Sequence, residues 1–338
     1  MRRNLHILIA IVLVLSACKK EQIEKADIVD EITIPAGFPA IQFPADNAYT
    51  PQRWALGKQL FFDPVLSSDS TISCASCHNP AKAFSDEVAF SKGVKDRLGT
   101  RNSPTLTNVA YLPYFTREGG VPTLEMQTLV PIQEHNEFDF NIVLIGERLR
   151  RNPKYVQMAK EAYNREPDPF VIARALASFE RSLISGNSAY DKYTYQNNPA
   201  ALSENERKGM ALFFSEKTQC SKCHSGFNFS NNAFENNGLY DNYTDSGRKR
   251  LTNLSVDFAL FKVPTLRNVG VTAPYMHDGS LTTLEAVVEH YNTGGKNNPQ
   301  KSKLIQPLNL TDDDKEQLVA FLKSLTDYAF ITNPKFKQ

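Results

Sequence analysis

The sequence predicts a mainly helical protein made of two domains with long loops. Two helix-start signals support this: Thr50-Pro51, an N-cap followed by proline, and Ser203-x-x-Glu206, a capping box. Each signal is followed by an apolar run and then by a C-x-x-C-H motif. Strand-like alternation is scarce, and 338 residues suit one large or two modest domains.

Composition excludes some functions. The chain has 38 basic and 37 acidic residues, so no net field favours binding to nucleic acid. A hydrophobic content of 41% is ordinary for a globular protein with a full core.

The N-terminal residues have the pattern of a processing signal. Two arginines precede an apolar run over residues 5–15, which is shorter than the roughly 20 residues that span a bilayer. The following Leu15-Ser16-Ala17-Cys18 resembles a lipobox. We therefore expect residues 1–17 to be a lipoprotein signal peptide and Cys18 to carry lipid. The alternative is an ordinary signal peptide with an incidental cysteine.

Residues 18–45 are charged and then rich in proline, as is typical of a tether. The protein is thus expected on the extracytoplasmic (periplasmic) side, attached to a membrane only through the lipid on Cys18.

The remaining four cysteines all lie in C-x-x-C-H motifs, Cys74-Ala75-Ser76-Cys77-His78 and Cys220-Ser221-Lys222-Cys223-His224. This motif attaches c-type haem: the thiols bond to the vinyl groups and the histidine binds the iron. Zinc ribbons place their cysteine pairs about 15–20 residues apart, much closer than here. Structural disulfides are the better alternative, but they do not require a histidine after each pair.

The two haem motifs divide the chain into two cytochrome c-like domains, expected over residues 46–192 and 193–338. The boundary falls near the polar stretch 191–200. Residues 170–184 are apolar on most faces and predict a helix buried between the halves. A last helix is expected to start at Thr311, with Asp314 three residues on, and to bury Leu318, Phe321, Leu322 and Leu325.

The first haem lacks a nearby sixth ligand of the common kind. No histidine or methionine lies between His78 and Met126, so one axial position is expected to be open to peroxide. Peroxide cleavage needs a group that moves a proton, and an amide can orient the substrate. Glu134, His135 and Glu137 are candidates for the proton carrier, and spacing does not choose among them. The alternative is that they are solvated loop residues.

The second haem has a candidate ligand in Tyr291. Leu284, Val287, Val288 and Tyr291 follow helical spacing and share one face, with His290 to one side. Tyrosine on such a face is commonly a core residue, but it is also a known haem ligand.

These features together resemble the family of bacterial di-haem cytochrome c peroxidases and MauG. The resemblance runs from about Pro51 to Phe330. It is carried by motifs in the expected order, Leu56–Pro64, Ile72–His78, Arg101–Thr105, Ala177–Gly186, Pro264–Val269 and Pro274–Gly279.

The resemblance implies roles for individual residues. Gln127 matches a glutamine of the peroxide pocket and Glu137 matches the catalytic glutamate, which makes Glu134 and His135 bystanders. The side chain of Asn102 and the backbone carbonyls of Thr272 and Pro274 match a calcium site between the haems, and such hard oxygen donors suit calcium. His277 and Asp278 are interpreted as structural groups.

The chain departs from the family pattern in three places. Members that need prior reduction have a histidine in the loop matching Ser91–Gly99; here the matching slot is near Val94 and no histidine occupies the loop, so we expect activity without reductive activation. Tyr291 stands where many peroxidases have methionine and MauG-like members have tyrosine, with Met276 and His290 as fallback ligands. Arg117 stands in the slot of a tryptophan between the haems, and the single tryptophan is Trp54. Candidates for a substitute electron route are Tyr111, Tyr114 and Phe115.

The expected function is that of a cytochrome c peroxidase. Hydrogen peroxide would be reduced to water at the N-terminal, peroxidatic haem, with electrons entering through the C-terminal haem from a small cytochrome c or copper protein. Arg248-Lys249-Arg250 could dock an acidic donor, although such a run is commonly just a solvated face. The alternatives are a MauG-like oxidase of a partner protein's side chains and a di-haem electron carrier. Relatives also include homodimers, but the sequence has no interface signal.

Overall fold

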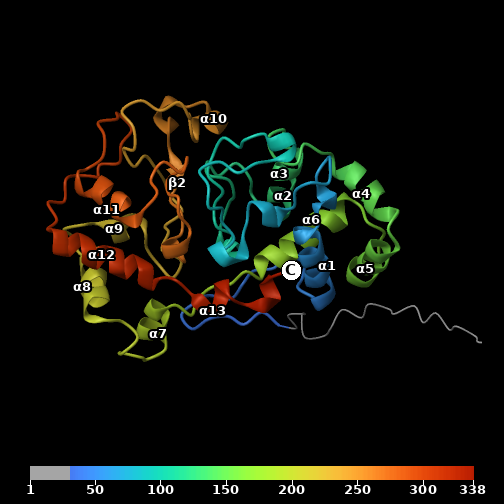
Figure 1. Cartoon of the computed structure of the whole chain (residues 1–338), viewed down its shortest axis with the longest axis horizontal. Coiled ribbons are helices and arrows are strands. Elements are labelled where there is room, and N and C mark those ends of the chain that lie inside the picture. The colour runs from blue at the N-terminus through green and yellow to red at the C-terminus, as the bar shows by residue number, and fades with distance from the viewer. Residues whose placement is uncertain (1–30) are drawn as a thin grey trace, which may run out of the picture.

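The computed structural model describes residues 31–338 and is mainly helical, as the sequence predicts. Figure 1 shows two lobes side by side, the first half of the chain on the right and the second on the left. The helices of the first half are α1 (Pro51–Phe62), α2 (Leu124–Gln127), α3 (Leu129–Gln133), α4 (Ile142–Arg150), α5 (Pro153–Tyr163) and α6 (Pro169–Arg181). Those that follow are α7 (Ala189–Tyr195), α8 (Glu204–Phe213), α9 (Cys220–Cys223), α10 (Lys249–Thr252), α11 (Leu284–Asn292), α12 (Asp312–Ser324) and α13 (Tyr328–Ile331).

The described strands form one short antiparallel ribbon. β1 (Phe234–Glu235) pairs with β2 (Phe261–Lys262), with Phe234 opposite Lys262. Long loops connect the remaining elements, and they carry much of the surface where the two lobes meet.

The predicted helix starts are confirmed by their capping contacts. The Thr50 hydroxyl accepts from the backbone N–H of Arg53 at the start of α1. Ser203 caps α8 and Thr311 caps α12, each in a reciprocal capping box. The first turn of a helix leaves backbone N–H groups without partners, and the capping side chain accepts a hydrogen bond from one of them. Both groups lie within three residues of each other, so these contacts can be predicted from the local sequence.

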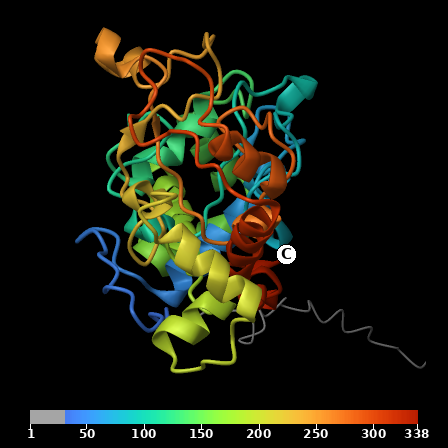
Figure 2. The ribbon, with the colours of Figure 1, turned by 90° about the vertical axis from the view of Figure 1, so that its left-hand side faces the viewer.

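Each half is built on one close helix crossing that requires glycine. Gly57 on α1 lies against the backbone of α6, where an added Cβ would stand 1.9 Å from the Ala175 carbonyl oxygen. Gly209 on α8 lies against α12 in the same way, 1.8 Å from the Gln317 carbonyl oxygen. Figure 2 shows α8 and α12 packed together in the second half. A phenylalanine trio sits at each crossing, Phe61, Phe84 and Phe179 in the first half and Phe213, Phe229 and Phe321 in the second.

Two segments lie elsewhere than expected. The helix predicted between the halves is α6, and it packs against α1, α2 and α4 in the core of the first half. The C-terminal segment crosses back to that same core, where the rings of Phe330 and Phe336 lie 5.9 and 6.3 Å from the ring of Phe84. The expected boundary at residues 192 and 193 falls inside α7.

The part of the expected tether that the structure describes, residues 31–45, lies against the folded protein. The ring of Phe38 is 4.6 Å from that of Phe227, and Pro35 touches Gly186. These apolar contacts hold a segment whose proline content alone predicted a free linker. The signal peptide and Cys18 lie outside the described residues. Within residues 31–338, no helix combines the length and apolarity needed to cross a membrane.

Candidate active site

The first C-x-x-C-H motif folds into a tight turn that presents its histidine. The backbone N–H groups of Cys77 and His78 both donate to the Cys74 carbonyl oxygen, at 3.2 and 3.0 Å, and close the motif into one turn. The Nδ1 atom of His78 lies 2.8 Å from the carbonyl oxygen of Phe84. This contact orients the ring and leaves Nε2 to bind a metal, the usual arrangement of a ligating histidine.

The second motif repeats this geometry in α9. The backbone N–H of His224 donates to the Cys220 carbonyl oxygen at 2.9 Å, and its Nδ1 lies 3.1 Å from the Phe229 carbonyl oxygen. All four motif cysteines are free thiols, so the structure does not support the disulfide alternative. Free thiols and oriented histidines fit covalent attachment of one haem at each motif.

Glu137 is the most buried of the three candidates for moving a proton. Glu134 and His135 are exposed, and His135 contacts Arg97 and Asp139 at the surface. Burial raises the pKa of Glu137 to about 7, and the charge of Glu134 adds to this shift. A carboxyl group with this pKa can both accept and return a proton near neutral pH.

Electrostatics also place Glu137 near the first haem motif. The negative charge of Glu137 contributes to the raised pKa of both Cys74 and Cys77, behind the larger effect of burial. Glu137 therefore lies within electrostatic range of both thiols, and its role as the acid–base group stays a prediction.

Gln127 ends α2 with an unsatisfied acceptor. Its Oε1 atom is buried, yet it has no hydrogen-bond partner among the described residues. A buried carbonyl oxygen without a partner is costly, and such an atom suits a site where a ligand donates to it.

The loop of residues 91–99 packs under the Glu137 segment. Val94 is fully buried, and its backbone N–H donates to the Glu137 carbonyl oxygen at 2.9 Å. The isopropyl side chain of Val94 offers no atom that binds iron. The position that could carry a capping histidine is thus filled by a core residue.

Glu180 is a buried carboxyl group close enough to the first haem motif to affect it, and the sequence did not single it out. It is the one carboxylate in α6, it is buried, and burial raises its pKa to about 8. Its charge contributes to the raised pKa of Cys74, so it lies near the first haem motif. The available signal was a lone acidic residue in a helix that is otherwise apolar on most faces.

Tyr291 lies near the second haem motif, on α11. Burial raises its pKa to about 12, and the charges of Cys220 and Cys223 contribute to this shift. Asn237 forms a side-chain hydrogen bond with it. The predicted ligand therefore lies within electrostatic range of both cysteines of the motif.

Both fallback ligands are held by the same asparagine. The side-chain Nδ2 of Asn237 donates to Met276 Sδ at 3.1 Å. The ring Nε2 of His290 lies 3.0 Å from the Asn237 backbone oxygen. These contacts give Met276 and His290 other partners, and the assignment of Tyr291 stays a prediction.

Charged residues tie the two lobes together. Glu118 of the first half is buried and pairs with Arg250 of the second half, while Arg248 donates to the Glu118 backbone oxygen at 2.8 Å. Arg101 pairs with Asp245 across the same seam at 2.7 Å. Two of the three charges in the basic run 248–250 are thus used within the chain.

Aromatic rings also cross this seam. Tyr114 stacks on Phe234 with ring centres 5.2 Å apart, and Tyr111 meets Phe227 edge-on at 4.9 Å. Phe115, the third candidate for an electron route, is buried in a cluster of the first half.

His277 and Asp278 make structural contacts. The His277 ring stacks on Phe261 at 4.3 Å, and Asp278 accepts from the Tyr240 hydroxyl at 2.6 Å.

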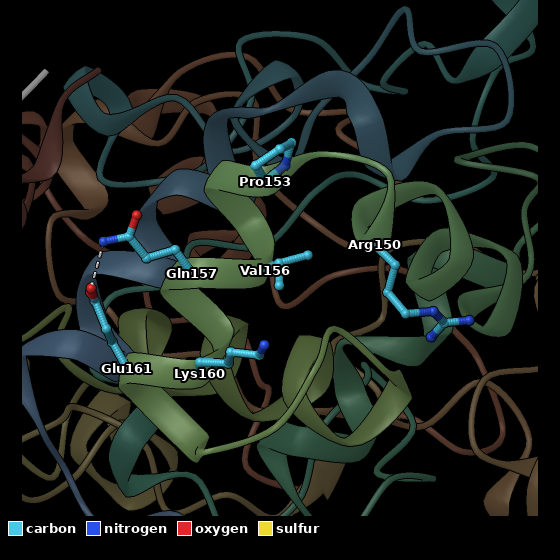
Figure 3. A pocket seen from close by; sticks show the side chains of 6 residues that line it. All are labelled: Arg150, Pro153, Val156, Gln157, Lys160 and Glu161. Atoms are coloured by element: carbon cyan, nitrogen blue, oxygen red, sulfur yellow. Dashed lines mark hydrogen bonds between the residues drawn. The ribbon is translucent and has the colours of Figure 1, made fainter. Parts of the chain in front are cut away.

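A separate hollow lies on the outside of the first half. Its volume is about 480 Å³. Figure 3 shows the six residues that line it, which are Arg150 of α4 and, on α5, Pro153, Val156, Gln157, Lys160 and Glu161. Its lining includes no residue of the haem motifs, so it lies outside the candidate site.

Comparison with known proteins matches nearly the whole described chain. Residues 51–199 match the family model of di-haem cytochrome c peroxidase, and residues 206–326 match that of cytochrome c. The methylamine utilization protein MauG of Methylorubrum extorquens is 35% identical over 302 residues, 88% of this chain and 84% of that protein. The cytochrome c551 peroxidase of Pseudomonas aeruginosa is 33% identical over 285 residues, 81% and 79% respectively. The crystal structure of a MauG-like protein associated with microbial copper homeostasis superposes with a TM-score of 0.86 at 31% identity, covering 90% of this chain and 97% of that one.

Proposed function

This chain belongs to the family of di-haem cytochrome c peroxidases and MauG proteins, and on that premise we propose that it reduces hydrogen peroxide to water. Two haems c are attached at its C-x-x-C-H motifs. The electrons come from a small cytochrome c or copper protein. The observation that carries this proposal is Glu137, a partly buried carboxyl group with a pKa near 7 beside the first haem motif.

Held at His78 and His224, the first haem would supply an iron that reacts with peroxide and the second would supply a path for electrons. The protein's own groups then do three things. His78, oriented by the Phe84 carbonyl, holds the first haem from one side. Glu137 takes a proton from one oxygen of the peroxide and returns it to the other, which leaves as water. The remaining oxygen becomes the second water when two electrons from the donor protein and two protons reach it. Gln127 offers its unpaired Oε1 atom to a donor on the substrate.

We propose that this reaction needs no prior reduction of the protein. Val94 is buried beneath Glu137 and cannot bind iron, so its loop carries no group to block the open position at that point. Tyr291 is the residue that we propose would bind the iron of the second haem, because it is buried and within electrostatic range of Cys220 and Cys223.

The second candidate function is oxidation of side chains on a partner protein. Two observations favour it: Tyr291 stands at the position where MauG-like members use tyrosine, and a MauG is 35% identical to this chain. Such an enzyme draws its electrons from the partner protein instead of from a small donor.

Steady-state turnover separates these functions. The full-length holoprotein, as isolated, is mixed with hydrogen peroxide and excess reduced small cytochrome c or copper protein. Many donor molecules oxidised per enzyme support the peroxidase, provided that Glu137→Gln slows the reaction and Glu134→Gln does not. The peroxidase function is contradicted if the number of donor molecules oxidised per enzyme does not exceed the number of oxidising equivalents that one enzyme molecule can hold.

We also propose that the protein is exported and anchored through Cys18, which rests on the sequence pattern of residues 1–18. Calcium at Asn102 is not part of the proposal, because the side chain of Arg117 contacts both oxygens of that residue.

A further inference from the structure

The site expected to bind calcium is filled by an arginine side chain. Arg117 Nη2 donates to the backbone oxygen of Asn102 at 2.6 Å and to its side-chain Oδ1 at 3.1 Å. Arg117 Nε reaches the same backbone oxygen at 3.3 Å. The Asn102 amide is held in this orientation because its Nδ2 donates to the Val88 carbonyl oxygen at 3.1 Å. Both Asn102 oxygens therefore already face a cation.

This pair of residues joins the two halves of the chain. The backbone N–H of Asn102 donates to the carbonyl oxygen of His277 in the second half at 2.9 Å. The carbonyl oxygen of Arg117 in turn accepts from the backbone N–H of Lys262 at 2.6 Å. Asn102 and Arg117 thus lie at the seam between the lobes, where the sequence resemblance implies a bridging ion.

The charges around Arg117 favour one fixed cation and oppose a second. Burial lowers the pKa of Arg117 to about 10, so the guanidinium stays charged at neutral pH. The nearby cations Arg101 and Lys262 add positive charge. The carboxylates of Asp278, Glu118 and Asp245 offset it, and Glu118 and Asp245 are themselves paired with arginines. A divalent ion on the Asn102 oxygens would lie within a few ångströms of a permanent positive charge, which repels it.

We propose that the Arg117 guanidinium takes the place of the divalent cation expected at Asn102, so that a side-chain cation of the chain itself lies at the seam where the two lobes meet. The residues around Asn102 then do not fit calcium in the wild-type chain. The proposal goes beyond the peroxide chemistry and does not depend on it, since it concerns metal content and stability.

The test measures bound calcium and thermal unfolding of the full-length holoprotein. Wild-type protein dialysed against calcium and then desalted should contain no stoichiometric calcium, and its Tm should be the same in EGTA and in calcium chloride. One tightly bound calcium per chain, or a Tm that falls in EGTA, would overturn the proposal.

Variants at position 117 make the test specific. Arg117→Met removes the charge and frees the Asn102 oxygens, so its Tm should fall and calcium chloride should raise it again. Arg117→Lys keeps a cation near Asn102 and should not respond to calcium. If Arg117→Met does not fold, the wild-type measurement and the lysine variant still decide the question, since a calcium response of Arg117→Lys contradicts the proposal.

Arg148 provides a matched control away from the seam. Its guanidinium also donates to backbone oxygens, those of Val65 and Ser67 at 2.8 Å each. Arg148→Met should lower the Tm without creating a calcium response. An equal rise in Tm with calcium in both methionine variants would contradict a site specific to Asn102.

Discussion

The backbone N–H of Val94 donates to the carbonyl oxygen of Glu137 at 2.9 Å, so the loop of residues 91–99 supports the segment that carries the proposed acid–base group. Gly93, the preceding residue, is packed directly under the same segment. The geometry of Glu137 thus depends on a loop that contains no catalytic side chain.

Gly93→Ala should displace Glu137 and slow peroxide turnover. An added Cβ would stand 2.1 Å from the Asn136 carbonyl oxygen and 2.6 Å from that of Glu137, so the segment must move. A displacement of about 1 Å at a catalytic group can cost about 10²-fold in rate. Gly99→Ala, in the same loop, is the control, because its nearest neighbours lie at 3.6 and 3.8 Å. Equal rates for the two variants would show that the loop does not position Glu137.

Glu137 should produce an acidic limb in the pH–rate profile. Its ionised form accepts the proton, and its pKa is raised to about 7, so the rate should fall as the pH drops through about 7. Glu137→Gln should lower the rate by about 10²–10⁴ and abolish the limb. Glu134→Gln should keep the rate at high pH but move the limb to lower pH, because the charge of Glu134 helps to raise the pKa of Glu137. A limb that does not move would mean that another group titrates.

Glu180 should make the protein less stable in alkali. Burial raises its pKa from 4.5 to about 8, so the folded state holds the proton more tightly than the unfolded state. The contribution of Glu180 to the free energy of unfolding is complete below pH 4.5, and it is lost as the pH rises through about 8. Glu180→Gln should reduce the loss between pH 5 and pH 9 by on the order of 4 kcal/mol in denaturant unfolding. Glu147 is exposed, so Glu147→Gln should lose as much unfolding free energy between pH 5 and pH 9 as the wild type. An equal loss in Glu180→Gln would show that Glu180 is not the group that titrates.

Local signals in the sequence predicted the starts of α1, α8 and α12 and the two haem motifs. Thr50, Ser203 and Thr311 cap their helices through hydrogen bonds to residues three positions on, which any short window of sequence contains. The C-x-x-C-H motifs are equally local. For these features the interacting groups are neighbours along the chain, so spacing alone was informative.

Contacts between residues that are far apart in the sequence could not be predicted from local spacing. The rings of Phe330 and Phe336 pack against the ring of Phe84, some 250 residues earlier in the chain. The spacing of apolar residues in the sequence does not predict this contact. The Arg117 contact with Asn102 is shorter in range, but only the folded loops show that the guanidinium meets both asparagine oxygens. Spacing likewise left Glu134 and Glu137 equivalent, because burial distinguishes them and burial depends on the tertiary fold.

Tyr291→Phe should change the spectrum of the second haem. The variant removes the only oxygen of the proposed ligand while keeping the ring that packs near Cys220 and Cys223. The second haem should then lose its low-spin ferric signature or take up a methionine signature from Met276. His290→Gln is the control, because the imidazole already contacts the Asn237 backbone oxygen at 3.0 Å. An unchanged spectrum in Tyr291→Phe would exclude tyrosine ligation.

Asn237→Leu should make Met276 a competitor for the second haem. The asparagine Nδ2 donates to Met276 Sδ at 3.1 Å and also bonds to Tyr291. Without the Asn237 amide, the Met276 sulfur loses its hydrogen-bond donor and the Tyr291 hydroxyl loses a partner. A methionine charge-transfer band should appear in the variant and disappear again in Asn237→Leu/Met276→Leu. Absence of the band with an unchanged Tyr291 signature would show that Asn237 does not hold Met276 away.

The central claim is that the two haem sites differ, one open to substrate and one closed by a side chain. Absorption and electron paramagnetic resonance spectra of the oxidised holoprotein, before and after one equivalent of hydrogen peroxide, test it most directly. We predict one high-spin and one low-spin centre at rest, and a rapid spectral change with peroxide without prior reduction. Two six-coordinate low-spin centres that do not respond to peroxide would contradict the proposed function.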